Sequence, residues 1–288
     1  MLLKDNEKEK ESESNMYLCY IDGEFVAPEN AKLPVSDLII QRGVGLFEAI
    51  ATHGMKSLML TPHVERLLNS AAKTGIVNLP SAEFIKNVIR EGLAKIGRDA
   101  RVRPFITGGD EFDAKAGAFT KPRFFVIFDE LGYVKPEEYE NGAVLDPVPY
   151  GRDDPAIKSV DYRSTFLMSE KAMEILYCPN GEITESGHGN FFMISDGKLI
   201  TAPLSRVLKG TTRGAILELA RESGIVIEER CPLWTELKNA QEAFVTGSIK
   251  MVVPVVQIGS VKIGNGKPGE ITRKLSDLYK KYMERWLE

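Results

Sequence analysis

The spacing of hydrophobic residues along the chain predicts a mixture of strands and helices. Short apolar runs and two-residue alternation are typical of β-strands, and they occur at residues 17–26, 47–54, 100–109, 123–131, 191–202, 242–248 and 252–259. Asp22-Gly23 and Asp196-Gly197 interrupt two of these segments. Both pairs predict tight hairpin turns, because aspartate and glycine tolerate the positive φ angles that such turns require.

Apolar residues at three- and four-residue spacing predict helices in other segments. These segments lie at 57–76, 81–97, 159–181, 210–225 and 270–287. Ser81 is expected to cap the second helix and Thr211 or Thr212 the fourth, whereas the last helix is expected to be peripheral. Because strands and helices mix without strict alternation, we predict a two-domain α/β or α+β chain.

A polar stretch near the middle of the chain marks the expected domain boundary. Residues 131–142 are rich in polar side chains, as is typical of an exposed interdomain linker. We therefore expect a small N-terminal domain at 16–130 and a larger domain at 143–288. Residues 1–15 carry mixed charges and no aromatic side chain, which predicts a disordered tail.

Composition narrows the class of protein. The chain has 288 residues, 43% hydrophobic and 27% charged, which suits a globular core. Its net charge of −4 gives no sign of nucleic-acid binding. No apolar run approaches the roughly 18 residues that span a bilayer, and the N-terminus lacks the apolar segment of a signal peptide. Three cysteines without metal-ligand spacing predict neither a disulfide framework nor a zinc site. We expect a cytoplasmic protein without a metal.

Two segments could bind an anion, although each signal is weak alone. In 208–220, Gly210 precedes two threonines at an expected helix start, where free N–H groups attract negative charge. In 244–250, Thr246, Gly247 and Ser248 follow a strand and offer hydroxyls and amides. An ordinary capped helix and an ordinary turn are the alternatives.

Three ionisable side chains are further candidates for chemistry. Glu185 ends a strand-like segment and would need a partner if it were buried, but a solvated turn glutamate is the more frequent alternative. Glu185 stands three residues before His188, but no third residue is found to complete a metal site with them. Nothing next to Lys158 distinguishes it from a solvated lysine.

The order and spacing of the motifs are more specific than any one of them. The motifs are Asp22-Gly23, Asp37 before the stretch that ends in Phe47-Glu48, His63-x-x-Arg66-Leu67, Lys158 before Asp161-Tyr162, Thr184-Glu185 through Asn190, Gly210-Thr211-Thr212-Arg213, and Thr246 to Val255. In this order they resemble the fold-type IV pyridoxal-phosphate (PLP) enzymes. That family, the class IV aminotransferases, includes branched-chain aminotransferases, D-amino-acid aminotransferases and aminodeoxychorismate lyases.

The resemblance implies a small N-terminal α/β domain and a larger domain with a barrel-like core. It implies that PLP forms a Schiff base with Lys158, which also moves the substrate proton, and that Glu185 lies beside the pyridine nitrogen. Arg66 and Ser248 would bind the phosphate. The other cofactor-binding residues implied by the motifs are Tyr162, Gly210, Thr211, Thr212 and Gly247. The family also implies a homodimer with active sites near the subunit interface.

Departures from the family pattern leave the substrate open. Leu38 and Ile39 replace the usual Arg-Gly after Asp37, whereas Arg42 stands just before Gly43. The substrate-binding candidates are Arg42, Phe47, Arg103 and Ile249.

The candidate arginines favour one substrate class. In the family, typical D-amino-acid aminotransferases hold the substrate carboxylate with an Arg-x-His pair, and Arg42 and Arg103 could do this from neighbouring positions. The resemblance therefore favours a D-amino-acid aminotransferase with a 2-oxo acid such as 2-oxoglutarate as acceptor. Phe47 suits an aliphatic side chain, so a branched-chain L-amino-acid aminotransferase stays open. An (R)-amine transaminase and an aminodeoxychorismate lyase stay open as well. An inactive protein of this fold that only binds an anion is a further alternative, although retention of Lys158 and Glu185 argues against it.

Overall fold

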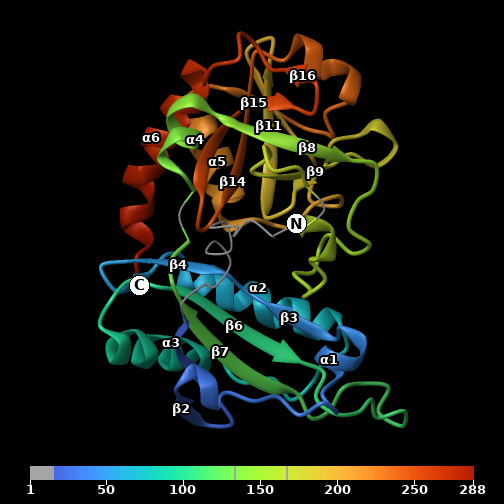
Figure 1. The fold of residues 1–288 in the computed structure, drawn as a ribbon, viewed down its shortest axis with the longest axis vertical. Helices are drawn as coiled ribbons and strands as arrows, with labels where there is room; N and C mark the ends of the chain where they lie inside the picture. Colours follow the sequence, from blue (N-terminus) through green and yellow to red (C-terminus); the bar gives the residue numbers. More distant parts are fainter. Residues whose placement is uncertain (1–15, 133, 167) are drawn as a thin grey trace, which may run out of the picture.

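The computed structural model describes residues 16–132, 134–166 and 168–288. The predicted disordered tail lies outside the described residues. Two sheets organise the chain, one built from strands between residues 16 and 129 and the other from strands between residues 143 and 262. The N-terminal sheet lies in the lower half of Figure 1 and the C-terminal sheet in the upper half.

The N-terminal sheet is antiparallel, with strand order β2-β1-β7-β6-β4-β5, and β3 pairs with β6. Its strands are β1 (Met16–Ile21), β2 (Glu24–Val26), β3 (Gly45–Phe47), β4 (Ile50–His53), β5 (Lys56–Ser57), β6 (Arg101–Thr107) and β7 (Arg123–Asp129). The predicted hairpin at Asp22-Gly23 is confirmed, since φ is 51° at Asp22 and 91° at Gly23.

Two amphipathic helices, α2 (Leu60–Lys73) and α3 (Ala82–Ile96), pack against this sheet. The side chain of Ser81 accepts a hydrogen bond from the Phe84 N–H at 3.2 Å, so the predicted cap of α3 is confirmed. Gly92 lets α3 approach the sheet closely, because a Cβ there would lie 2.1 Å from the ring of Phe128. The short elements η1 (Pro28–Asn30) and α1 (Leu38–Arg42) precede β3.

The C-terminal sheet closes into a barrel. Its strands are β8 (Ala143–Val148), β9 (Glu174–Tyr177), β10 (Glu185–Ser186), β11 (Gly189–Ser195), β12 (Lys198–Thr201), β13 (Val226–Glu229), β14 (Glu242–Gly247), β15 (Met251–Ile258) and β16 (Val261–Lys262). The order is β10-β9-β8-β15-β14-β11-β12-β13 with β16 on β15, and β10 also pairs with β11. That extra pairing joins β8, β9, β10, β11, β14 and β15 into a ring. The expected barrel-like core is confirmed.

The last helix differs from its prediction, because α6 (Glu270–Met283) is part of the core. Leu275 and Tyr279 are fully buried, and they pack with α5 (Thr211–Glu222) over β14 and β15. Leu275, Tyr279, Tyr282 and Met283 recur at helical spacing and form one buried face. The expectation of a peripheral helix was wrong.

The prediction of a helix within 159–181 is also wrong. The described part of that segment contains the short 3₁₀ helices η2 (Arg163–Phe166) and η3 (Pro179–Gly181) and the strand β9. All four residues of β9 are buried between β8 and β10. A short apolar run has the same pattern in a buried strand as in a buried helix. Here the segment forms a strand because it pairs with β8 and β10.

Contacts between distant parts of the chain join the two halves. The helix α4 (Pro136–Asn141) lies in the expected linker and packs against β15. The remaining elements are the 3₁₀ helices η4 (Trp234–Asn239), between β13 and β14, and η5 (Glu284–Trp286), after α6. The side chain of Glu288 accepts hydrogen bonds from the Thr61 N–H at 3.0 Å and from its hydroxyl at 2.5 Å. The start of α2 is therefore held by the C-terminal half.

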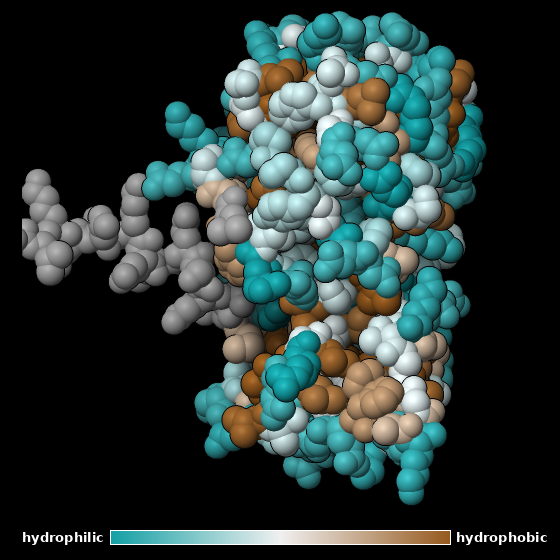
Figure 2. Space-filling model, turned by 90° about the vertical axis from the view of Figure 1, so that its right-hand side faces the viewer, coloured by the Kyte–Doolittle hydropathy of each residue, from teal (hydrophilic) through white to brown (hydrophobic). Residues whose placement is uncertain are grey.

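The outer surface is mostly hydrophilic over the C-terminal half on the face shown in Figure 2, whereas apolar side chains gather over the N-terminal half. Exposed apolar residues of the N-terminal half include Val35, Ile40 and Phe112. Within the described ranges, no helix combines the length and apolarity needed to cross a bilayer.

Candidate active site

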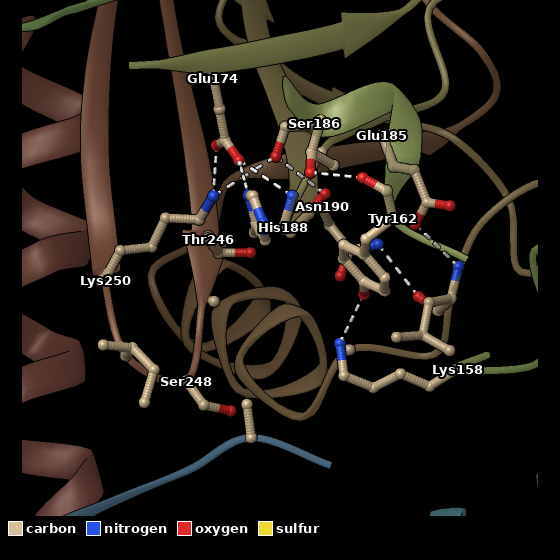
Figure 3. Close-up of a pocket in the computed structure, with 18 of the residues that line it drawn as sticks. Lys158, Tyr162, Glu174, Glu185, Ser186, His188, Asn190, Thr246, Ser248 and Lys250 are labelled. Carbon is tan, nitrogen blue, oxygen red and sulfur yellow. Dashed lines mark hydrogen bonds and ion pairs between the residues drawn. The ribbon is translucent and has the colours of Figure 1, made fainter. Parts of the chain in front are cut away.

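A cavity of about 600 Å³ is lined by residues from both halves of the chain. Figure 3 shows that side chains from β9, β10, β14 and the loops beside them point into it. The predicted site residues that line the cavity are Phe47, Arg66, Arg103, Lys158, Tyr162, Glu185, Gly210, Thr211, Thr212, Gly247, Ser248 and Ile249. Arg42 is the exception: it is exposed on α1 and donates a hydrogen bond to the Gln41 carbonyl at 3.1 Å.

Lys158 enters the cavity from the segment between β8 and β9 of the C-terminal half. Its carbonyl accepts a hydrogen bond from the Phe47 N–H at 3.1 Å, which fixes the lysine backbone against β3. Its Nζ donates to the Tyr162 hydroxyl at 2.9 Å and lies 4.7 Å from the centre of the Phe47 ring. The amine is thus hydrogen-bonded to Tyr162 (Figure 3), and the ring of Phe47 lies beside it.

Glu185 is buried, with 4% of its surface exposed, and it has two partners. Arg152 Nη1 donates to Oε1 at 3.2 Å, and the Leu208 N–H donates to Oε2 at 3.0 Å. Burial raises the pKa of Glu185, and the positive charge of Arg152 opposes that effect. Arg152 was not predicted from the sequence, because nothing in its polar loop indicates that it reaches Glu185 on β10.

The helix α5 begins at the cavity without a side-chain cap. Its N-cap is Gly210, so the prediction that Thr211 or Thr212 caps the helix was wrong. Glycine fits because a Cβ at position 210 would lie 2.1 Å from Asn190 Oδ1. The uncapped N–H groups of the first turn and the helix dipole favour an anion at this end of the cavity.

Arg66 and a buried carboxylate flank the start of α5. Arg66 Nε donates to Glu48 Oε1 at 2.7 Å, Nη2 donates to Oε2 at 2.6 Å, and Nη1 donates to the Lys209 carbonyl at 2.7 Å. Burial alone would raise the pKa of Glu48, but the positive charge of Arg66 and the hydrogen bonds from Arg66 and His63 outweigh it and hold the pKa below its usual range. A guanidinium has more N–H donors than these contacts use, so Arg66 can also bind a ligand.

His63 connects Glu48 to two hydroxyls in the cavity. Burial lowers the pKa of His63, which favours a neutral ring, and Nδ1 lies 2.8 Å from Glu48 Oε2. An ionised carboxylate can accept hydrogen bonds but cannot donate them. Nδ1 of His63 therefore carries the proton, and Nε2 accepts hydrogen bonds. Ser248 Oγ lies 2.9 Å from Nε2 and Thr211 Oγ1 lies 3.3 Å from it. His63 therefore orients hydroxyls that face the start of α5.

Two arginines of β6 line the cavity and share one buried carboxylate. Arg101 donates to both oxygens of Asp129, at 2.9 and 2.8 Å, and Arg103 also pairs with Asp129. Burial lowers the pKa of Arg103, against the attraction of Asp129, but an arginine remains charged. The Nε of Arg103 is buried without a hydrogen-bond partner in the described residues. Among the described residues, these two guanidinium groups pair with one carboxylate. Arg101 and Arg103 are two residues apart on β6, so their side chains point to the same face of the strand. This spacing could have identified Arg101 as a second candidate beside Arg103.

Comparisons with known proteins identify the family and the fold. Residues 45–258 match the family described as amino-transferase class IV. The D-alanine aminotransferase of Staphylococcus aureus (strain N315) is 30% identical over 284 residues, which cover 92% of this chain and 97% of that protein. The structure of Escherichia coli branched-chain amino acid aminotransferase has a TM-score of 0.82 at 25% identity, covering 96% of both chains.

A second solved structure is similar in fold. It is the branched-chain amino acid aminotransferase of T.th. with pyridoxamine 5'-phosphate, with a TM-score of 0.85 at 24% identity, covering 96% of this chain and 98% of that one. The match over residues 45–258 shows that the chain belongs to the class IV aminotransferases. Enzymes of this class use pyridoxal 5'-phosphate, and this chain is a PLP-dependent aminotransferase.

The donor groups of the cavity fit this cofactor. The uncapped start of α5 and the spare N–H groups of Arg66 suit a doubly charged phosphate. Thr246 Oγ1 is buried in the cavity wall without a partner in the described residues, so it is available to a bound group. The buried carboxylate of Glu185 suits a protonated ring nitrogen.

Proposed function

We propose that this enzyme transfers an amino group from a D-amino acid to a 2-oxo acid such as 2-oxoglutarate. The observation that carries the proposal is the Arg101–Arg103 wall of the cavity, where two guanidinium groups share Asp129. A substrate carboxylate would supply a second negative charge for the two arginines and a partner for Arg103 Nε, which has none among the described residues. The similarity to a D-alanine aminotransferase supports the same proposal.

The proposed roles of the chain's own residues follow from their contacts. When bound, PLP supplies a conjugated ring that accepts the electrons of the bond broken at the substrate α-carbon. Lys158 would hold the cofactor covalently and then carry the proton from the α-carbon, with Tyr162 directing its amine. Glu185, oriented by Arg152, would keep the ring nitrogen protonated. Arg66, Thr211, Thr212 and Ser248 would hold the phosphate.

A branched-chain L-amino acid is the second candidate substrate. Phe47 and Phe105 stack with ring centres 5.4 Å apart, and both line the cavity. This apolar wall suits an aliphatic side chain, and the structural likeness to a branched-chain enzyme supports the same candidate.

A donor panel separates the two candidates. The yellow holoenzyme would be mixed with D-alanine, D-glutamate, L-leucine, L-glutamate or (R)-1-phenylethylamine without acceptor, while the visible absorbance of the cofactor is followed. We expect the D-amino acids alone to convert it. Conversion by L-leucine and L-glutamate instead would overturn the proposal in favour of the branched-chain candidate.

Arg103→Met tests the carboxylate site. We expect the KM for a D-donor to rise by about 10- to 100-fold with a smaller change in kcat, because a hydrogen-bonded charge is worth about 1.5–3 kcal/mol. Arg90→Met on α3, an exposed arginine outside the cavity, is the matched control. An unchanged KM in Arg103→Met would remove this arginine from the substrate site.

Arg66→Lys tests the phosphate site. We expect the PLP dissociation constant of the apoenzyme to rise by about tenfold or more. Lysine lacks the planar guanidinium group, whose several N–H donors can bind Glu48 and a phosphate at the same time. Pyridoxal, which lacks the phosphate, is the matched control ligand, and its affinity should stay unchanged. Equal losses for both ligands would show that Arg66 acts on the fold rather than on the phosphate.

We also propose a homodimer in solution. The exposed apolar residues Val35, Ile40 and Phe112 lie in the N-terminal half, on which Figure 2 shows apolar side chains gathering. Such surface is typical of subunit contacts. Sedimentation of the holoenzyme measures the mass directly.

A further inference from the structure

A second lysine is buried in the wall of the cavity, opposite Lys158 (Figure 3). Lys250 is 7% exposed and forms an ion pair with Glu174, which is 3% exposed. Its Nζ also lies 3.5 Å from Ser186 Oγ. Lysine is rarely buried unless it is paired, and the roles proposed above use neither Lys250 nor Glu174.

The Lys250 side chain joins two separate elements of the barrel. Lys250 belongs to the loop 248–250 between β14 and β15, whereas Glu174 begins β9, which is separated from β15 by β8. Two glycines line the path, because a Cβ at Gly189 or Gly247 would lie 2.9 or 3.1 Å from Lys250 Cε. The lysine therefore ties the loop to the far side of the barrel.

The backbone of the same loop is held as well. Gly247 pairs with Met251, and Met251 has φ of 54°, a left-handed conformation that is uncommon for residues other than glycine. Tyr139 donates a hydrogen bond to the Lys250 carbonyl at 3.0 Å. With its carbonyl and its ammonium both bound, Lys250 fixes the loop at two points.

Glu174 extends the contact to the opposite loop. Its Oε2 accepts a hydrogen bond from the His188 N–H at 2.9 Å and lies 3.4 Å from His188 Nδ1. Burial would raise the pKa of Glu174, but the charge of Lys250 lowers it to about 2, so the carboxylate is ionised at neutral pH. The loops at 186–189 and 248–250 are thus held by one ion pair.

We propose that Lys250 and Glu174 are positioning residues that fix the 248–250 loop, so that Ser248 is held where it binds the phosphate of PLP. Ser248 already lies 2.9 Å from His63 and 3.5 Å from Thr211 at the start of α5. The inference rests on the proposed phosphate site and is independent of the choice between D- and L-donors.

The test compares single and double variants. Lys250→Met or Glu174→Gln alone breaks a buried pair, which destabilises a protein because a charge stays unpaired. The double variant Lys250→Met/Glu174→Gln removes both charges, and the new side-chain amide keeps an acceptor for the His188 N–H. We expect the Tm of the double variant to recover toward that of the wild type. The matched control is Lys198→Met/Glu228→Gln, an ion pair between β12 and β13 outside the cavity.

Two readouts distinguish positioning from stability. In the double variant we expect faster hydrogen exchange of the 246–251 backbone in the apoenzyme and a PLP dissociation constant about tenfold higher, the loss typical of one hydrogen bond to a charged group. The control pair should change neither. Wild-type exchange and wild-type PLP affinity in a stable double variant would overturn the inference. Both readouts need no turnover, so a wild-type enzyme that converts only L-donors would overturn the D-donor proposal and leave this one standing.

Discussion

Replacing Lys158 by alanine is expected to abolish transamination and to leave the purified protein without the yellow colour of bound PLP. The variant loses the amine that would hold the cofactor and move the proton at the substrate α-carbon. Proton transfer by a positioned side chain alone is worth about 10²–10⁴-fold, so we expect a loss at or beyond the upper end of that range. In the wild type this amine lies 2.9 Å from the Tyr162 hydroxyl.

The measurement must separate Lys158 from the other cavity lysine. Borohydride reduction of the holoenzyme followed by peptide mass spectrometry identifies the lysine that carries the cofactor. Lys238→Ala, at an exposed lysine of η4, is the control for a general effect of removing a lysine. Cofactor found on Lys250, or full activity in Lys158→Ala, would contradict the assignment.

Replacing Glu185 by glutamine is expected to lower kcat by about 10²–10³-fold, the range seen when a preorganised electrostatic contact to the reacting group is removed. Glutamine keeps the shape of the side chain but not the charge that would hold the ring nitrogen protonated. PLP binding should change much less than kcat, because the phosphate contacts remain.

The pH dependence of kcat gives a second readout for Glu185. Without the cofactor, burial raises its pKa, whereas a protonated ring nitrogen beside it would lower that pKa. As the pH falls through the pKa that results, the wild-type carboxylate becomes neutral, and kcat should fall on the acid side. This acid limb should be absent from Glu185→Gln. Glu182→Gln, which removes a half-exposed partner of Arg206, is the matched control. Wild-type turnover in Glu185→Gln would remove this carboxylate from the proposed machinery.

Local signals in the sequence were enough to predict most elements and the family of this protein. Asp-Gly turns, strand alternation and the Ser81 cap depend on neighbouring residues, so they predicted the hairpins, the strands β6 and β7 and the helix α3 without tertiary information. The ordered motifs predicted the class IV aminotransferase family and its cofactor, which the family match confirms. The domain division at 131–142 remains a prediction.

Contacts between distant residues became known only from the folded chain. Local spacing could not show that α6 enters the core, that 174–177 pairs as a strand, or that Arg42 stays outside the cavity. Nor could it pair Arg152 with Glu185 or Lys250 with Glu174, which lie 33 and 76 residues apart in the chain. These outcomes depend on burial and charge pairing between separate elements, and a buried charge finds its partner only when the barrel closes.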